Sequence, residues 1–376
     1  MDNKSTATIT WLRYYNFGSY LQAYGLQQTL IKLGYANNII ADEGIIPPKV
    51  TTPKRICLKI RSFIKILLLF FPIMRYKSKK HHSEKLYFDF RKKFLMVDED
   101  SVIEGSLGKL DYNQYICGSD QIWHPLVASP LEPFYYAGFT KKKRIAYAAS
   151  FGVSSYPDSR KSEFIELTKD FYSISCREKV GCQIIKYLLG KDVTYVLDPT
   201  LLLSGEQWRS VSLRPVGFNE EKYILTYFLT PNKWYVNYAR EYARKRGLKL
   251  VTFYLRPLSP RECDETVVAG PSQFVWLVDH AEELFTDSFH GSVFASLLHT
   301  PFIGFCRFRP HTRYEGQNHR LEDLYTLMGV NDHFIRNVED CRRIPNLAPL
   351  DFNMMESRLQ SMKETSISFL KNSLNG

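Results

Sequence analysis

The residue that points most directly to chemistry is His290, in the stretch FTDSFHGSVFA over residues 285–295. Apolar residues up to Phe285 predict a strand, and the apolar run after Ser292 predicts a helix. Free N–H groups and the positive dipole at the start of a helix bind anions, and an imidazole there can donate a proton near neutral pH. The stretch predicts an anion site beside a general acid. The alternative is a histidine that makes only structural hydrogen bonds.

A second group of polar residues follows a predicted strand in GSDQIW, residues 118–123. Asp120 and Gln121 come just after the strand, with Trp123 close by. A carboxylate, an amide and an indole suit a sugar, because its hydroxyls need hydrogen-bond partners and its apolar face packs on aromatic rings. The alternative is that Asp120 caps a helix and Trp123 belongs to the core.

Two further turns carry candidate ligand-binding groups. Arg177 follows a predicted strand in SCRE and offers a planar fork for a carboxylate or a phosphate. The alternative for Arg177 is an ion pair with Glu178 or Asp198. The turn NFGS at residues 16–19 resembles the phosphate-binding loop of a dinucleotide fold, but it lacks Gly-x-Gly-x-x-Gly, so the sequence predicts no NAD site.

The elements that must position these residues predict an α/β protein. Residues 8–42 have the pattern of a strand, a helix and a second strand, which indicates a parallel, doubly wound sheet. A second series of strands and helices begins after Asp198. This restart predicts two similar α/β halves with a cleft between them, and ligands of such sheets bind outside the carboxyl ends of the strands.

The composition is that of a globular protein. A chain of 376 residues suggests two domains at roughly 100–200 residues each, and 44% hydrophobic with 24% charged residues is typical of a protein with a sizeable core. The first residues show no signal-peptide pattern. The seven cysteines have no Cys-x-x-Cys and no paired Cys/His spacing, which favours a reducing cytoplasm. We therefore predict a cytoplasmic protein without a bound metal.

The net charge of +11 comes from one segment. Residues 54–93 contain 13 Lys/Arg and 2 Asp/Glu, whereas the rest of the chain contains 37 of each. The longest uncharged run there, residues 66–74, is nine residues long, and a membrane-spanning helix needs about 20. Basic residues beside a Leu/Phe-rich helix suit the surface of an anionic bilayer, and the alternative is a packed helical insertion with solvated lysines. The neutral remainder argues against nucleic acid as a partner.

Taken together, these stretches resemble the polysaccharide pyruvyl transferase family. The matching stretches occur in the same order as in the family and cover most of residues 9–330, with residues 45–95 covered least. They are NFGSYLQAYGLQ, CGSDQIWHP, RIAYAASFG, ISCREKVG, LDPTLLL, YILTYFL, FTDSFHGSVFASLLHTPF and NHRLEDLYTLMG.

The resemblance implies a GT-B-like fold, in which two Rossmann-like α/β domains face each other across a cleft that contains the active site. We expect residues 1–198 to form the acceptor-side domain, with the basic and apolar insertion at about 45–95. We expect residues 199–345 to form the donor-side domain and residues 346–376 to form a C-terminal helix.

The resemblance also implies transfer of pyruvate from phosphoenolpyruvate to a sugar as a cyclic ketal, with release of phosphate. Members of the family act on precursors of cell-surface polysaccharides such as exopolysaccharides and capsules, often in lipid-linked form. The expected partners are phosphoenolpyruvate, a polyprenyl-linked saccharide and an anionic membrane surface, at the inner face of the cell membrane. No cofactor is expected, because phosphoenolpyruvate is a donor substrate.

In the family, the residues that match Arg177 and His290 are associated with phosphoenolpyruvate. Many members carry an arginine two residues before this histidine, where the present chain has Ser288, and Arg320 could supply the missing charge. We assign His290 as the general acid and Asp120 as the base on the acceptor side. The predicted donor-binding residues are Arg177, Ser288, Gly291, Ser292 and Arg320, and the predicted acceptor-binding residues are Asn16, Ser19, Gln121 and Trp123.

Two other functions are compatible with this fold. A GT-B glycosyltransferase would use a nucleotide sugar and would need a pocket for a base and a ribose. A non-catalytic member would bind a saccharide or scaffold a biosynthetic complex, and the absence of an arginine at the position of Ser288 fits such a role.

Overall fold

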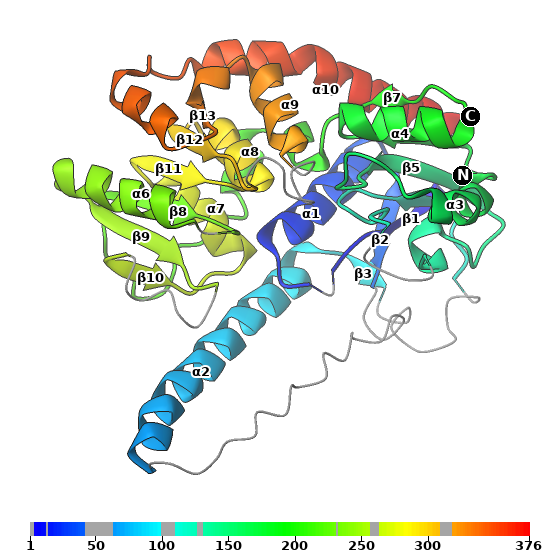
Figure 1. Cartoon of the computed structure of the whole chain (residues 1–376). Coiled ribbons are helices and arrows are strands. Elements are labelled where there is room, and N and C mark those ends of the chain that lie inside the picture. Colours follow the sequence, from blue (N-terminus) through cyan, green and yellow to red (C-terminus); the bar gives the residue numbers. More distant parts are fainter. Residues whose placement is uncertain are drawn as a thin grey trace.

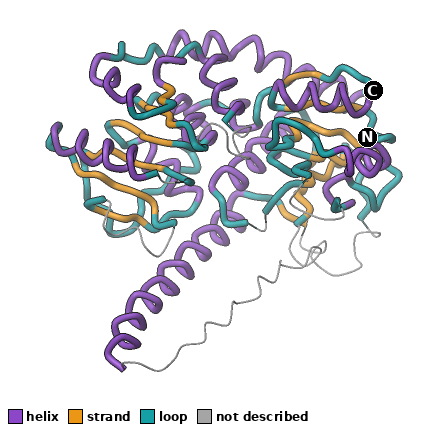
Figure 2. Tube along the Cα trace, in the orientation of Figure 1, coloured by secondary structure: helices purple, strands orange, loops and turns teal. Residues whose placement is uncertain are grey.

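The computed structural model describes residues 4–12, 14–41, 63–98, 110–125, 131–230, 232–255, 263–308 and 318–376. Within these residues the chain forms two parallel β-sheets, one from each half of the sequence. Helices flank the strands in both halves, as Figures 1 and 2 show. Covered on both faces, the inner strands are buried along nearly their whole length, as is usual for parallel sheets, whereas β3, β7 and β10 are only partly buried.

The sheet of the N-terminal half has seven strands in the order β3-β2-β1-β4-β5-β6-β7, and every neighbouring pair is parallel. The direction of the strand order reverses between β1 and β4, and ligands bind at the carboxyl side of such a switch point. The strands are β1 (Ser5–Ile9), β2 (Ala36–Ile40), β3 (Val97–Asp98), β4 (Gln114–Cys117), β5 (Lys143–Ala149), β6 (Ser173–Cys176) and β7 (Thr194–Tyr195).

The sheet of the C-terminal half has six parallel strands in the order β10-β9-β8-β11-β12-β13. Its switch point lies between β8 and β11, so the segment that leaves β11 and contains His290 begins at the ligand-binding edge. The strands are β8 (Tyr223–Tyr227), β9 (Lys249–Phe253), β10 (Glu265–Val267), β11 (Glu283–Thr286), β12 (Phe302–Phe305) and β13 (Phe334–Ile335).

The helices that begin at the two switch points both start with a side-chain cap. Asn16 Oδ1 accepts a hydrogen bond from Ser19 N at 3.3 Å, and Ser288 Oγ accepts one from Gly291 N at 3.3 Å. Such caps stabilise the first turn, whose N–H groups lack intrahelical partners. The helices are α1 (Phe17–Lys32), α2 (Phe63–Phe94), α3 (Lys161–Thr168), α4 (Lys179–Leu189), α5 (Gly205–Arg209), α6 (Lys233–Lys245), α7 (Pro271–Asp279), α8 (Phe289–Leu298), α9 (His319–Met328) and α10 (Phe352–Asn375).

Helix α10 contacts both halves of the molecule and runs along the top of the view in Figure 1. Near its start, Glu356 Oε1 lies 2.8 Å from Nε2 of His299, at the end of α8. Further along, Ser366 Oγ accepts a hydrogen bond from the backbone N–H of Leu197 at 2.8 Å. The last helix therefore returns from the C-terminal half to the N-terminal half and ties the two together.

Aromatic residues pack at the junction of the two halves. The ring of Phe17, at the start of α1, stacks on Phe274 of α7 with ring centres 4.8 Å apart and on Tyr87 of α2 with ring centres 5.7 Å apart. All three belong to one hydrophobic cluster that extends through both halves. This shared core fixes the relation between the two sheets.

Helix α2 contains much of the basic segment and extends away from both sheets in Figure 1. Its C-terminal part is packed, since Tyr87 and Phe90 are buried and Ser83 Oγ donates a hydrogen bond to the carbonyl of Ala269 at 3.2 Å. Residues 45–62 of the predicted insertion lie outside the described residues. Among the helices that the structure describes, none has the length and apolar character needed to cross a bilayer.

The predicted fold class is confirmed, because both sheets are parallel and doubly wound and a pocket lies between the two halves. This arrangement is GT-B-like. The predicted domain boundary at residue 198 falls between β7 and β8, and α10 lies within the segment 346–376.

Candidate active site

A pocket of about 330 Å³ lies between the two halves, at the carboxyl ends of the strands next to both switch points. One wall comes from residues that follow β1 and β4. The other wall comes from residues that follow β8 and β12 and from the starts of α8 and α9. The lining residues are Trp11, Tyr14, Asn16, Ser19, Asp120, Gln121, Leu229, Ser288, Phe289, His290, Arg307 and Arg320.

His290 is the second residue of α8, and its ring lies between the two halves of the chain. Its Nε2 lies 3.7 Å from Oδ2 of Asp198, which is longer than a hydrogen bond but within the range of an ion pair. On its other side, Nδ1 faces Gly18, where a Cβ atom would lie only 2.0 Å away. The ring can occupy this position only because residue 18 has no side chain.

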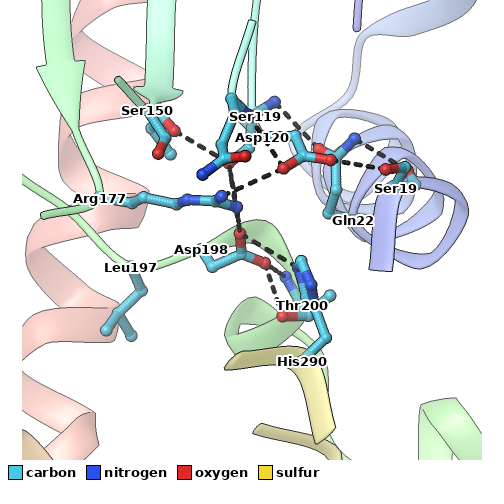
Figure 3. Close-up of polar contacts among 12 residues, drawn as sticks. Ser19, Gln22, Ser119, Asp120, Ser150, Arg177, Leu197, Asp198, Thr200 and His290 are labelled. Carbon is cyan, nitrogen blue, oxygen red and sulfur yellow. Dashed lines mark hydrogen bonds and ion pairs between the residues drawn. The ribbon is translucent and has the colours of Figure 1, made fainter. Parts of the chain in front are cut away.

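Arg177 follows β6 and joins the carboxylates of Asp120 and Asp198, as Figure 3 shows. Its Nη1 donates to Asp198 Oδ2 at 2.5 Å, and its Nη2 donates to Asp120 Oδ1 at 3.2 Å. The side chain of Arg177 is only 2% exposed and that of Asp198 is 0% exposed. Of the two ion-pair partners that the sequence offered for Arg177, Asp198 is the one that forms the pair. The other, Glu178, accepts a hydrogen bond from Ser150 Oγ at 2.9 Å instead.

The charges of this network stabilise one another. Burial opposes ionisation of Asp198, but the close approach of His290 and the charge of Arg177 outweigh burial and hold the pKa of Asp198 well below the usual range. Burial also opposes ionisation of Asp120, but Arg177, His290 and Ser19 outweigh this effect and lower the pKa of Asp120. Burial disfavours the charge of Arg177, yet the two carboxylates raise its pKa. Both acids and Arg177 are therefore ionised at neutral pH.

Asp120 is the member of this network that reaches the pocket. Ser19 Oγ donates to its Oδ2 at 2.6 Å, and the backbone N–H of Gln121 donates to its Oδ1 at 2.9 Å. Its φ of +66° lies in the left-handed region, which turns the chain sharply after β4. The carboxylate is thus held by residues from both β–α turns of the switch point.

Two arginines line the opposite wall. Arg307 Nε donates to Thr230 Oγ1 at 3.0 Å. The side-chain oxygen of Gln121, with its amide oriented to satisfy both groups, lies 2.9 and 3.0 Å from Nη1 and Nη2 of Arg320. Burial, together with repulsion from Arg177 and Arg307, lowers the pKa of Arg320 to about 10, so this side chain is still a cation at neutral pH.

This arrangement can bind an anion and move a proton. The start of α8 and the two arginines provide positive charge, His290 provides an exchangeable proton, and Asp120 with Ser19 can accept and donate hydrogen bonds to a hydroxyl group. Within the described ranges, no three His, Cys, Asp or Glu side chains are grouped so that they could hold a metal ion.

Comparison with known protein families decides which class this site belongs to. A sequence profile of the family described as polysaccharide pyruvyl transferase matches residues 16–305, well over half of the chain. The chain belongs to the polysaccharide pyruvyl transferase family. The match includes the turns at both switch points, with Asn16, Asp120 and His290. It also includes Arg177, which follows β6.

Solved structures similar to this family member show low sequence identity. A UDP-GlcNAc 2-epimerase from Methanocaldococcus jannaschii is 12% identical, with 96% of this chain and 99% of that chain covered and a TM-score of 0.48. The S. aureus MnaA–UDP structure is 11% identical over 99% and 97% of the two chains, with a TM-score of 0.48. A glycosyltransferase from Streptomyces sp. SF2575 with thymidine diphosphate is 12% identical over 98% of each chain, with a TM-score of 0.45. No curated protein sequence matches significantly.

Seven of the eleven predicted site residues of this pyruvyl transferase family member line the pocket. They come from three separate β–α turns and from the start of α9, and the docking of the two halves brings them together at one pocket. The roles assigned to them stay predictions. These residues are Asn16, Ser19, Asp120, Gln121, Ser288, His290 and Arg320.

Gly291 and Ser292, predicted to bind the donor, are turned into the body of the second half. A Cβ atom on Gly291 would lie 2.4 Å from Thr286 Oγ1, and Ser292 Oγ lies 3.0 Å from the hydroxyl of Tyr325. Their backbone N–H groups are bonded to the side chain and the carbonyl of Ser288, respectively. Neither residue lines the pocket, so the structure does not bring these two predicted donor-binding residues together with the others.

Trp123 also lies away from the pocket, which corrects the expectation that it stacks on a sugar. Its side chain is 0% exposed, and its ring is parallel to that of Tyr136 with ring centres 5.6 Å apart. Phe151 and Phe164 pack around it in the core of the N-terminal half. The structure therefore supports the alternative interpretation, in which Trp123 is a core residue.

Sequence reasoning missed several residues of the site. Asp198 was considered only as an ion-pair partner, although the Asp-Pro break after a predicted strand marks it as a strand-end residue. Trp11 follows β1 and Arg307 follows β12, so the same strand-end rule could have identified both. The other missed lining residues are Tyr14, Leu229 and Phe289.

Proposed function

We propose that this protein transfers pyruvate from phosphoenolpyruvate to a saccharide as a cyclic ketal and releases phosphate. Membership of the family supports pyruvyl transfer to a polysaccharide. The observation that carries the finer proposal is the position of His290, at the start of α8 and 3.7 Å from the buried carboxylate of Asp198, in a pocket that also contains Arg307 and Arg320. Phosphoenolpyruvate chemistry needs such a proton donor beside an anion site.

The reaction begins at the C3 methylene of phosphoenolpyruvate. His290 gives its proton to C3, which becomes a methyl group, and positive charge develops at C2. Asp198, held in place by Arg177 and by the hydroxyl of Thr200 at 2.6 Å, provides a counter-charge for the protonated ring. A sugar hydroxyl then adds to C2 and loses its proton to a base.

Asp120 is the proposed base on the acceptor side. Its lowered pKa makes it a weak base, because Arg177 and Ser19 already stabilise the carboxylate. A hydroxyl that adds to a carbocation-like C2 becomes strongly acidic, so a weak base suffices for this step. Phosphate then leaves C2, a second hydroxyl of the same sugar adds there and loses its proton, and the cyclic ketal is complete.

The proposed acceptor is a polyprenyl-linked precursor of a cell-surface polysaccharide, which the protein meets as a peripheral protein on the cytoplasmic face of the membrane. Helix α2 supports this part of the proposal, because it extends from the body and its described part carries exposed Lys80, Lys85, Lys92 and Lys93. Basic side chains of this kind are attracted to anionic headgroups and to a lipid pyrophosphate.

The test is incubation of the purified protein with phosphoenolpyruvate and a panel of polyprenyl-linked glycans, followed by mass spectrometry. We expect an acceptor that is heavier by one ketal-linked pyruvate, with one phosphate released for each product. Binding and turnover of a uridine or guanosine diphosphate sugar, with none of phosphoenolpyruvate, would overturn the proposal in favour of a glycosyltransferase. Saccharide binding without turnover of either donor would favour a non-catalytic role.

A further inference from the structure

The anion that enters the pocket needs cationic partners, and Arg177 is poorly placed to be one. Both ends of its guanidinium are already bonded to carboxylates, at 2.5 Å to Asp198 and 3.2 Å to Asp120. Its side chain is 2% exposed and does not line the pocket. A ligand could reach Arg177 only by displacing a buried carboxylate, which would leave that charge unpaired at a large cost in free energy. Arg177 therefore acts as a positioning residue for Asp120 and Asp198.

Arg307 and Arg320 have the opposite character. Both line the pocket and are half-buried, and within the described ranges neither lies within 4.0 Å of a carboxylate oxygen. Each is anchored by a neutral group, Arg307 through Nε to Thr230 Oγ1 at 3.0 Å and Arg320 through its Nη atoms to the Gln121 amide. Their charges are thus held in place without direct pairing to a carboxylate, although the more distant charges of Glu178 and Asp120 raise the pKa of Arg320.

The charge of the pocket wall follows from these contacts. The lining residues include two cations, Arg307 and Arg320, and one anion, Asp120, whose charge is already compensated by Arg177. The start of α8 adds the positive end of a helix dipole to the same side. Repulsion between Arg307 and Arg320 contributes to the lowered pKa of Arg320. A ligand with two anionic groups would relieve this repulsion.

We propose that Arg307 and Arg320 together form the clamp for the donor, one binding its phosphate and the other its carboxylate. The inference rests on the proposed function for the identity of the donor, but the clamp itself requires only a small ligand with two anionic groups. The clamp also explains how the site binds an anion with Ser288 at the position where many family members carry an arginine. The Ser288 hydroxyl instead caps α8 by accepting a hydrogen bond from Gly291 N at 3.3 Å. The positive charge comes instead from Arg307 and Arg320, on the same wall of the pocket.

The test is calorimetric titration with phosphoenolpyruvate, inorganic phosphate and pyruvate. The variants are Arg307→Gln, Arg320→Gln and Arg177→Lys, and Arg244→Gln, on the exposed face of α6, is the charge-matched control. We expect Arg307→Gln and Arg320→Gln each to weaken binding of phosphoenolpyruvate by about 10- to 100-fold, as for loss of a hydrogen bond to a charged group. We expect the affinity of the Arg244→Gln control for phosphoenolpyruvate to stay within about threefold of the wild type. We expect the same of Arg177→Lys, although its thermal stability should be lower.

The outcomes separate the clamp from the proposed function. Wild-type affinity for phosphoenolpyruvate in Arg307→Gln and Arg320→Gln, with a large loss in Arg177→Lys, overturns the clamp and leaves the donor assignment intact. Binding of phosphoenolpyruvate that depends on both Arg307 and Arg320, with no ketal product formed from it, supports the clamp and overturns the proposed function. Failure of the wild type to bind any of the three ligands overturns both.

Discussion

The ring of His290 lies directly against Gly18, and a Cβ atom at residue 18 would be 2.0 Å from Nδ1 and 2.5 Å from Cγ. Gly18 belongs to the first turn of α1 in the N-terminal half, and His290 belongs to the first turn of α8 in the C-terminal half. The contact therefore joins the two switch points. It also means that the position of the proposed acid depends on the closure of one half upon the other.

We expect Gly18→Ala to lower turnover by about 100-fold or more, because the methyl group must displace the imidazole and a shift of about 1 Å at a reacting group can cost that much. Folding should be retained, since alanine favours a helix over glycine by about 1 kcal/mol. Turnover and thermal stability are measured together. The matched control is Gln28→Ala in the same helix, and unchanged turnover in Gly18→Ala would show that the ring position does not matter.

Replacement of His290 by Gln should lower turnover by about 10²–10⁴-fold, the usual contribution of a general acid. Donor affinity should change little, because the proposed clamp is formed by other side chains. The measurement is steady-state kinetics with phosphoenolpyruvate titration, and His82→Gln on the exposed face of α2 is the control. A variant that keeps wild-type turnover would make His290 a structural residue.

Asp198→Asn should destabilise the fold at neutral pH by roughly 3–5 kcal/mol, because it leaves Arg177 partly unpaired in the interior. The folded-state pKa of Asp198 is lowered, so its contribution is present above the unfolded value of about 3.9 and is lost as pH falls below that value. Urea unfolding of wild type and variant at pH 7, 5 and 3.5 should show the difference shrinking at the lowest pH. Asp192→Asn, in an exposed ion pair with Lys186, should have little effect, and an equal effect of both variants would contradict the prediction.

The two tryptophans near the site should behave differently. Trp123→Leu is expected to cost at least about 2 kcal/mol in the free energy of unfolding, since it leaves a cavity among Tyr136, Phe151 and Phe164. Acceptor affinity should be unchanged by it. Trp11→Leu in the pocket wall should instead weaken acceptor binding, which is measured by titration with the saccharide. The reverse pattern would restore Trp123 as a ligand-binding residue.

Helix α2 should bind anionic vesicles. We expect the protein to float with phosphatidylglycerol liposomes at low salt and to dissociate as salt rises, and the triple change of Lys85, Lys92 and Lys93 to Gln should weaken binding by about 1 kcal/mol per charge. The control removes three charges elsewhere, with Lys233, Arg244 and Lys245 on α6 changed to Gln. Equal flotation of both triple variants would indicate that α2 is only a packed insertion.

The sequence alone determined the elements of this fold and most of the pocket wall. Apolar runs ended by polar or small residues predicted the strands, and parallel strands place the residues that follow them at one edge. That rule is sufficient to bring Asn16 and Asp120 together at one sheet and to place His290 at the corresponding edge of the other, because it depends only on local pattern and on the direction of the chain. The caps at Asn16 and Ser288 are local for the same reason.

Only the tertiary structure decided how these side chains are used. Whether Arg177 offers its charge to a ligand depends on Asp120 and Asp198, which lie 57 and 21 residues away in sequence. Whether Trp123 faces a ligand or the core depends on the packing of rings from several helices and loops. The pairing of His290 with Asp198, and its fit against Gly18, requires the two halves to be docked. A strand-end pattern specifies where a residue lies along the edge of a sheet. The direction of its side chain, and whether its charge is paired, depend on contacts between segments far apart in the chain.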